Sequence, residues 1–321
     1  MSHPVDQANT LRKIMLKRRE AEFDDLKPLQ SPISVFTIAS GKGGVGKTVL
    51  TANLGAKLAR EGHRVLLVDG DLGLANLDII LGAQAFATLE DVLDGRAQLH
   101  EAILGIEPNL WLIPAGSGLM DLRESGPRMR AKLAKLLENC PWDLDMILMD
   151  VGAGIQQNVL SLHHPSYESV VILTPEPTSL TDGYSLIKLL RNKVGIDRVH
   201  VIVNQVADGK EAQATFHRLK DVAARFVNVQ LDYLGHVNRD EKITQSVMKR
   251  KILLDLDSEA PSLPCFELLS KRFKSVCADR AGNHVAQARA LTWSRFKDEP
   301  VHRAPGNTAK FWQTLLGEVK A

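Results

Sequence analysis

Short apolar runs alternate with amphipathic stretches over most of the 321 residues. The apolar runs are rich in Val, Ile and Leu, which is typical of strands buried on both faces of a sheet. The amphipathic segment after the first run carries Leu50, Leu54 and Leu58 at a helical spacing of four. Strands that alternate with helices predict an α/β protein with a parallel sheet between two helical layers. The predicted strands cover residues 34–40, 64–71, 110–115, 145–150, 169–174, 198–204 and 231–237.

Two helix boundaries follow from local residue types. Gly62 comes directly after the leucine-bearing segment, and we expect it to end that helix because glycine adopts the left-handed conformation at helix ends. A second helix is predicted over residues 179–192, with Thr178 or Ser179 as the residue that caps its N-terminus.

The pattern divides the chain into three regions. Residues 1–30 are polar and basic, and Pro28 and Pro32 bracket a linker that we do not expect to be helical. Residues 31–280 contain the alternating pattern and are predicted to form the compact domain. Residues 281–321 are polar and irregular and end in a short amphipathic stretch, which predicts an appendage to that domain.

Composition narrows the class of protein. The formal net charge is +2, so we expect no strong attraction of the whole protein to nucleic acid and no specific nucleic-acid partner. Cys140, Cys265 and Cys277 form no C-x-x-C pair, which favours reduced thiols in the cytoplasm. Residues 1–30 lack the apolar core of a secretory signal, and no run approaches the roughly 20 apolar residues that span a bilayer.

A glycine-rich run, "SGKGGVGKT" (residues 40–48), follows the first predicted strand and precedes the first predicted helix. This context and the pattern G-x-x-x-x-G-K-T predict a phosphate-binding loop. Backbone N–H groups of such a loop surround phosphate oxygens, and the helix N-terminus adds partial positive charge. Lys47 is predicted to neutralise the β- and γ-phosphates, and the Thr48 hydroxyl to bind Mg²⁺. The loop residues assigned to nucleotide binding are Gly41, Lys42, Gly43, Gly44, Val45, Gly46, Lys47 and Thr48.

Lys42 is a second lysine at the front of this loop. A lysine on the outer lip faces away from its own helix and can reach a phosphate bound to a neighbouring copy, like the arginine fingers of other NTPases. The alternative is an ordinary solvated lysine, and position alone does not decide between the two.

Three stretches resemble the MinD/ParA class of ATPases with a deviant phosphate loop: "KGGVGKT", "VDGDLGLANLDIILG" (68–82) and "DVGAGI" (150–155). The resemblance implies a three-layer P-loop NTPase fold and slow, Mg²⁺-dependent ATP hydrolysis coupled to dimerisation. It implies that Lys42 crosses the interface of an ATP-bound homodimer. It further implies that Asp71 orients the attacking water and that Asp69 supports the Mg²⁺ shell. Asp69 and Asp71 share a face if the chain stays extended there, and a turn would separate them.

Other polar residues follow predicted strands, where parallel sheets bind ligands. Asp150 ends an apolar strand and is predicted to hold Mg²⁺ through water. Asn204 ends a later strand and can both donate to and accept from adenine. Relatives often carry Pro-x-Asp after the next strand, whereas this chain has Asn238 and Asp240, which we include in the base pocket. Val151 stands where relatives often carry threonine or serine.

The two flanking regions suggest partners. The segment near the N-terminus resembles the activator motif of the FlhG (FleN) family, in which it stimulates the GTPase FlhF. The residues that carry this resemblance are Asp6, Gln7, Ala8, Leu11 and Arg12. The alternative is a flexible basic tail. A helix near the C-terminus would place four large apolar side chains on one side, suited to a membrane interface or to packing on the protein itself. These side chains are Phe311, Trp312, Leu315 and Leu316.

The sequence therefore predicts a flagellar-number ATPase in the cytoplasm, with reversible peripheral association with the inner membrane. Flagellar switch (C-ring) proteins or a transcription regulator are further candidate partners. A ParA-like role in DNA segregation or a MinD-like role in division-site placement is the alternative within the fold. An iron–sulfur scaffold would need the missing C-x-x-C, and the adjacent pair His163 and His164 is predicted to be a loop element. An adaptor that binds ATP without hydrolysing it is a further alternative.

Overall fold

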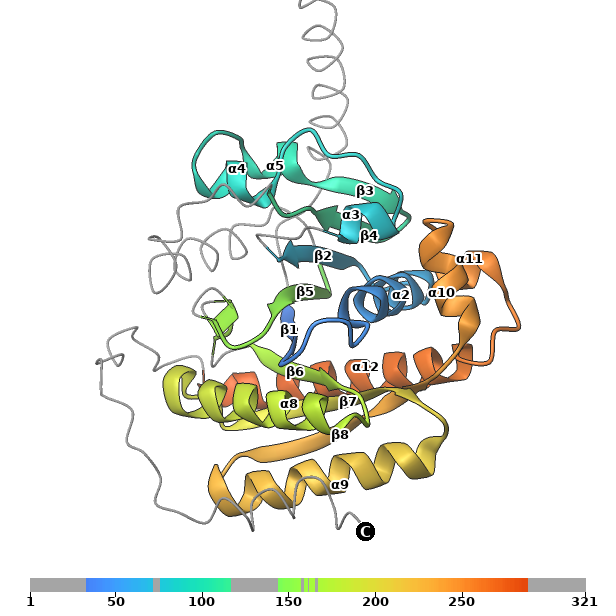
Figure 1. The fold of residues 1–321 in the computed structure, drawn as a ribbon. Helices are drawn as coiled ribbons and strands as arrows, with labels where there is room; N and C mark the ends of the chain where they lie inside the picture. The colour runs from blue at the N-terminus through green and yellow to red at the C-terminus, as the bar shows by residue number, and fades with distance from the viewer. Residues whose placement is uncertain are drawn as a thin grey trace, which may run out of the picture.

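The computed structural model describes residues 33–71, 76–116, 144–156, 159–160, 162–164 and 167–287, with side chains described as far as residue 279. These residues form an eight-stranded sheet in the order β3-β4-β2-β5-β1-β6-β7-β8 (Figure 1). The edge strand β3 is antiparallel to β4, and the other neighbours are parallel. The strands are β1 (Ser34–Ser40), β2 (Val65–Gly70), β3 (Leu104–Glu107), β4 (Leu110–Ile113), β5 (Met146–Ala153), β6 (Glu168–Leu173), β7 (Arg198–Val206) and β8 (Gln230–Asn238).

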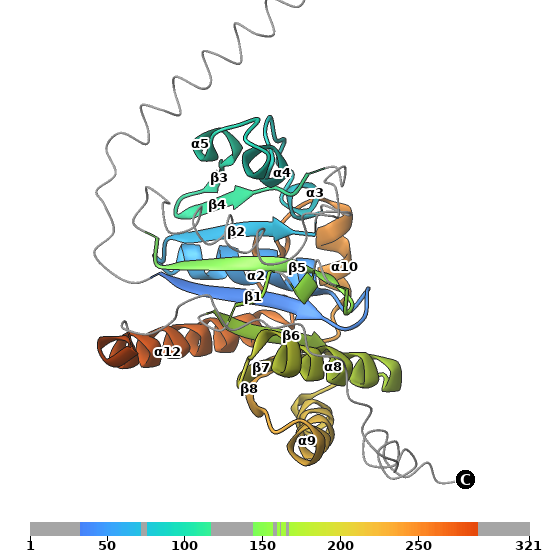
Figure 2. The same ribbon diagram turned by 90° about the vertical axis from the view of Figure 1, so that its left-hand side faces the viewer.

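Helices cover both faces of this sheet, as the two views of Figures 1 and 2 show. The longer ones exceed ten residues, whereas the shorter ones lie in two connections, between β2 and β3 and between β8 and α12. They are α2 (Lys47–Arg60), α3 (Leu77–Ile80), α4 (Leu89–Leu93), α5 (Leu99–Ala102), α8 (Pro177–Leu189), α9 (Gly209–Phe226), α10 (Glu241–Met248), α11 (Leu253–Leu256) and α12 (Leu263–Gln287).

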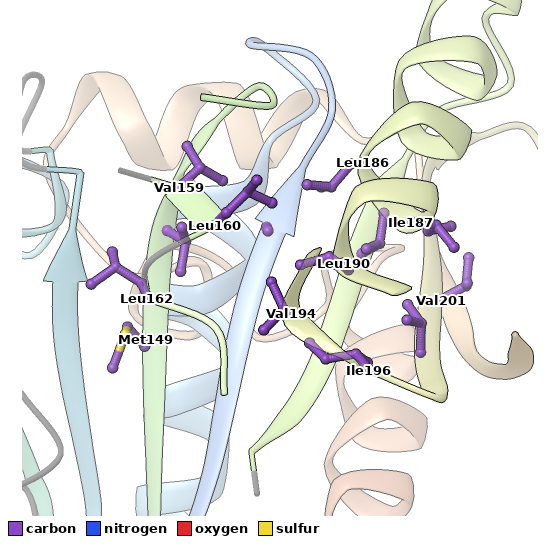
Figure 3. Packing of buried hydrophobic residues seen from close by; sticks show 14 of the residues in the cluster. Met149, Val159, Leu160, Leu162, Leu186, Ile187, Leu190, Val194, Ile196 and Val201 are labelled. Carbon is purple, nitrogen blue, oxygen red and sulfur yellow. The ribbon is translucent and has the colours of Figure 1, made fainter. Parts of the chain in front are cut away.

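Two apolar layers hold the three-layer arrangement together. On one face, α2 buries Leu50, Leu54 and Leu58 against the sheet and against α12. On the other face, α8 and α9 bury their apolar sides, and Figure 3 shows Leu186 and Ile187 of α8 packed over the strands. Burial of one such leucine or isoleucine contributes about 1.5–3 kcal/mol, so the two layers supply the main driving force for the fold.

The structure confirms the α/β class and every strand that the apolar runs predict, with shifts of a few residues at some ends. It adds β3, which the pattern misses because one of its four residues is buried and the run is not apolar. Gly62, with φ +90°, follows the end of α2 as predicted. Among the described residues, no helix combines the length and apolar character needed to cross a bilayer.

The predicted cap of α8 is wrong. The helix begins at Pro177, with Glu176 as its N-cap, because proline at the first helical position has a fixed φ that suits a helix start. The Ser179 hydroxyl instead accepts the backbone N–H of Thr174 at 2.9 Å. The predicted single helix to residue 192 is an α-helix that ends at Leu189, followed by a π-helical turn, Leu190–Val194.

Candidate functional site

The strand order places the glycine-rich loop at the point where ligands bind in open α/β sheets. β1 lies between β5 and β6, so the loop that leaves β1 opens at the carboxyl ends of the central strands. β2 pairs with β5 in a register that sets Asp69 beside Asp150 at the same edge. The predicted phosphate loop and the predicted carboxylates therefore meet at one site.

The loop owes its shape to left-handed glycines. Gly44 has φ +80° and Gly46 has φ +85°, values that residues with a side chain rarely adopt. Gly46 is the N-cap of α2, and no side chain caps that helix end. Its first backbone N–H groups therefore remain available to an anion. A Cβ at position 46 would lie 2.5 Å from the Asn204 amide nitrogen, so the loop and β7 approach closely there.

Lys47 and Asp150 form a buried ion pair under the loop. The Lys47 Nζ donates to Asp150 Oδ1 at 2.7 Å, and the two side chains are 7% and 1% exposed. Burial raises the pKa of Asp150, although the Lys47 ammonium and a hydrogen bond from the Thr48 hydroxyl oppose that rise. The three residues that were predicted to meet the phosphates and Mg²⁺ are in contact.

Asp69 and Asp71 differ in environment because β2 ends at Gly70. Asp69 is fully buried, and its carboxylate accepts the backbone N–H groups of Asp71, Asn76 and Leu77 at 3.0–3.1 Å. Burial, with the Asp150 charge second, raises the pKa of Asp69 to about 6. Asp71 lies beyond the strand end, and its carboxylate is 3.3 Å from the position that a Cβ on Gly152 would take. The turn separates the two acids, and Asp69 organises the backbone that leads into α3.

The donor set of this site fits Mg²⁺. Asp150 and the Thr48 hydroxyl place two oxygen donors side by side, and the Asp71 carboxylate is near enough for its charge to act on Asp150. Hard oxygen donors of this kind are the ligands that Mg²⁺ prefers, together with phosphate and water. No group of three or more His, Cys, Asp or Glu side chains encloses a metal within the part of the chain that the structure describes. A bound ion would therefore take its remaining ligands from water and the nucleotide.

Lys42 lies on the outer lip of the loop and is 39% exposed. Its Nζ donates to Glu176 Oε2 at 2.6 Å and to Thr178 Oγ1 at 3.1 Å, both at the start of α8. Next to it, a Cβ on Gly41 would lie 2.2 Å from the backbone of Asp182, so α8 packs directly on the loop. The contacts of the loop with Glu176, Thr178 and Asp182 could not be predicted from the sequence pattern, because they join segments more than 130 residues apart.

A cavity of about 400 Å³ opens beside the loop. Its apolar walls come from α2, β8, α10 and α12, and the lining includes the three predicted base-pocket residues Asn204, Asn238 and Asp240. Gln205, which the sequence did not suggest, also lines it; this residue has φ +58°, and its Nε2 donates to the Gly44 carbonyl at 3.4 Å. A mainly apolar pocket with a few amide groups suits a nucleobase.

The predicted partner and membrane residues lie outside the described residues. This holds for Asp6, Gln7, Ala8, Leu11 and Arg12 and for Phe311, Trp312, Leu315 and Leu316. Their assignments stay predictions.

Comparison with known proteins decides the family. A family model for the CobQ/CobB/MinD/ParA nucleotide binding domain matches residues 36–254, which is most of the chain. The chain belongs to this MinD/ParA family. Its ATPase class and its binding of ATP follow from that membership, together with the site described above.

Curated relatives confirm the predicted resemblance to FlhG/FleN proteins. The antiactivator FleN of Pseudomonas aeruginosa is 34% identical over 76% of this chain and 87% of that protein. The flagellum site-determining protein YlxH of Helicobacter pylori is 36% identical over 74% of this chain and 84% of that protein. Within the MinD/ParA family, this chain is thus of the FlhG/FleN type.

Solved structures confirm the predicted fold. MinD from Pyrococcus horikoshii, complexed with Mg-ADP, has a TM-score of 0.64 at 28% identity and covers 78% of this chain and 99% of its own. A chain of the MinC:MinD cell division protein complex of Aquifex aeolicus has a TM-score of 0.61 at 26% identity. That match covers 82% of this chain and 100% of the Aquifex chain.

Proposed function

We propose that this protein is an ATP-switched dimer that regulates the number or placement of flagella. The observation that carries the proposal is that the two lysines of the phosphate loop occupy different environments. Lys47 is buried beneath the loop against Asp150, whereas Lys42 is exposed on its lip. In this proposal Lys47 serves the protomer's own nucleotide, and Lys42, once it leaves Glu176 and Thr178, serves a nucleotide held by a second copy.

Lys42 must leave its partners on α8 to act across an interface. Its ion pair with Glu176 joins two side chains that are 39% and 59% exposed. Exposed pairs of this kind contribute about 0–1 kcal/mol, so release costs little compared with a contact to a phosphate. The hydrogen bonds at the start of α8 would then differ between monomer and dimer, because Glu176 and Thr178 lose their donor when Lys42 contacts the second copy's nucleotide.

The remaining site residues take roles around Mg-ATP. Bound Mg²⁺ would be held by Thr48 and, through water, by Asp150, and it would neutralise charge that develops on the phosphates. Lys47 would turn from Asp150 toward the phosphates when the nucleotide binds. Asp71, at the mouth of the site, would orient the attacking water. The expected part of Asp69 in the metal shell is secondary, because its carboxylate already accepts three backbone N–H groups.

The flagellar role is supported by the names of the relatives, one an antiactivator and one a flagellum site-determining protein. We infer that residues 6–12 stimulate a GTPase of the FlhF type, with Gln7 assisting hydrolysis in that partner. The C-terminal apolar residues would attach the ATP-bound dimer to the inner membrane, where two copies bind better than one.

The test of this function is deletion of residues 1–20. We expect the shortened protein to hydrolyse ATP at the wild-type rate and to lose all stimulation of FlhF GTP turnover. The single variant Gln7→Ala in the full chain should lose the same stimulation. Stimulation that survives in both variants would refute the activator role and leave the ATPase untouched.

A further inference from the structure

A buried polar cluster lies inside the apolar layer that α8 and α9 cover. His163 is fully buried, and its Nδ1 lies 2.9 Å from the Thr37 hydroxyl of β1 and 3.1 Å from the Ser169 hydroxyl of β6. Its Nε2 is also buried and has no hydrogen-bond partner within the described part of the chain. An apolar side chain would fill this place without the cost of burying an imidazole ring. The polar link between His163 and the two strands therefore calls for a role other than filling space.

The link holds the chain that leaves β5 onto the strand that leads into the phosphate loop. The backbone N–H of Gly154, directly after β5, donates to the Ser40 carbonyl at the end of β1 at 2.9 Å. Nine residues later, His163 reaches Thr37 of the same strand. The chain after Asp150 is thus attached to β1 at two points, one by its backbone and one by the His163 ring.

Leu162, the neighbour of His163, packs on the end of β2. It is 3% exposed, and its Cδ1 lies 2.8 Å from the position that a Cβ on Gly70 would take. Figure 3 shows Leu162 beside Met149 of β5. Gly70 is the last residue of β2 and directly precedes Asp71, whose carboxylate lies against Gly152. The position of Asp71 therefore depends on how Leu162 sits on the Gly70 backbone.

We propose that His163 is a positioning residue for ATP hydrolysis: it fixes Leu162 on Gly70 and thereby holds Asp71 where it orients the attacking water. The inference rests on the proposed function in one respect, namely the role of Asp71. Apolar contacts alone are not directional, whereas hydrogen bonds to hydroxyls on two strands define one position of the ring. A misplacement of about 1 Å can reduce a rate by about 10²-fold, so a buried residue that acts only through Leu162 can still set the turnover.

Release of labelled phosphate at a series of Mg-ATP concentrations tests this role. His163→Leu keeps most of the bulk and removes the polar link. We expect it to lower kcat about tenfold or more and to leave the KM for ATP within about twofold of wild type. His163→Asn places an amide near the position of Nδ1 and should retain more than half of the wild-type kcat. The same His→Leu change at His217, an exposed residue of α9, is the matched control and should alter neither constant.

A second comparison asks whether His163 acts through Asp71. In an Asp71→Ala chain, His163→Leu should cause no further loss of kcat, because the group that it positions is already absent. A further loss as large as that in the wild-type background would overturn the proposal. Wild-type kcat in His163→Leu, or a rise in KM without a fall in kcat, would overturn it as well.

Another variant covers the case in which His163→Leu does not fold. Thr37→Val/Ser169→Ala removes the same link from the side of the strands and should lower kcat in the same way, and wild-type kcat in this variant would contradict the proposal. Normal phosphate release by Asp71→Ala itself would instead refute the proposed role of Asp71, so the two failures are distinguishable.

Discussion

Replacement of Lys47 by alanine should abolish nucleotide binding and lower the free energy of unfolding. Lys47 is the ammonium that contacts Asp150, whose carboxylate is 1% exposed. Removal of one partner from a buried ion pair leaves an uncompensated charge and costs about 3–5 kcal/mol. The neighbouring charge of Asp71, which also raises the Asp150 pKa, adds to this cost. We expect Lys47→Ala to lower the free energy of unfolding by that amount at pH 7.5 without nucleotide.

Urea unfolding of four proteins measures this effect. The double variant Lys47→Ala/Asp150→Asn removes the stranded charge and should recover more than half of the lost stability, while it still fails to bind ATP. Lys57→Ala is the matched control on the same helix, since Lys57 pairs with Glu61 at 3.5 Å on a more exposed surface. We expect this control to lose less than about 1 kcal/mol. Wild-type stability in Lys47→Ala, or a double variant no more stable than Lys47→Ala, would refute the proposed cost of the stranded Asp150 charge.

Three further predictions concern the surroundings of the site. Burial lowers the pKa of His163 from 6.5 to about 3, so below pH 6.5 the unfolded chain binds a proton that the folded chain does not. The free energy of unfolding of the wild-type protein should therefore fall by about 2 kcal/mol between pH 7.5 and pH 5.0. Urea unfolding at both pH values should show that His163→Asn lacks this part of the fall. Gly41→Ala should weaken ATP binding at least about tenfold because its Cβ would strike the α8 backbone, whereas Gly43→Ala, with open space around it, should bind normally in a calorimetric titration. Asp71→Ala should keep ATP binding and lose about 10²-fold or more in turnover, and normal phosphate release would exclude Asp71 as the residue that orients water.

The sequence predicts what depends on local pattern. Apolar runs gave the parallel strands, and the glycine spacing with Lys47 and Thr48 gave the phosphate loop, because both features are contiguous in the chain. Asp150 could be placed in the site because the carboxyl ends of parallel strands meet at one edge. The position of Asn204, which we predicted to contact the base, follows from the same rule, and this residue lines the cavity beside the loop.

Contacts between distant segments could not be predicted. The pairing of Lys42 with Glu176 depends on how α8 packs against the loop, which no spacing encodes. The engagement of Asp69 by backbone N–H groups depends on where β2 ends. His163, predicted to be a loop element, lies between elements, but its ring is buried and its Nδ1 lies 2.9 Å from the Thr37 hydroxyl and 3.1 Å from that of Ser169. An adjacent pair of histidines gives no sign of such a cluster.

The most direct test of the account is the oligomeric state of two proteins, the Asp71→Ala variant and the double variant Asp71→Ala/Lys42→Ala. Light scattering measures each of them once with ATP and once with ADP. We predict a dimer with ATP, a monomer with ADP, and a monomer in both nucleotides once Lys42 is alanine, although that variant still binds ATP in a calorimetric titration. A Lys42→Ala chain that binds ATP and dimerises as well as its parent would contradict the role of Lys42 across the interface.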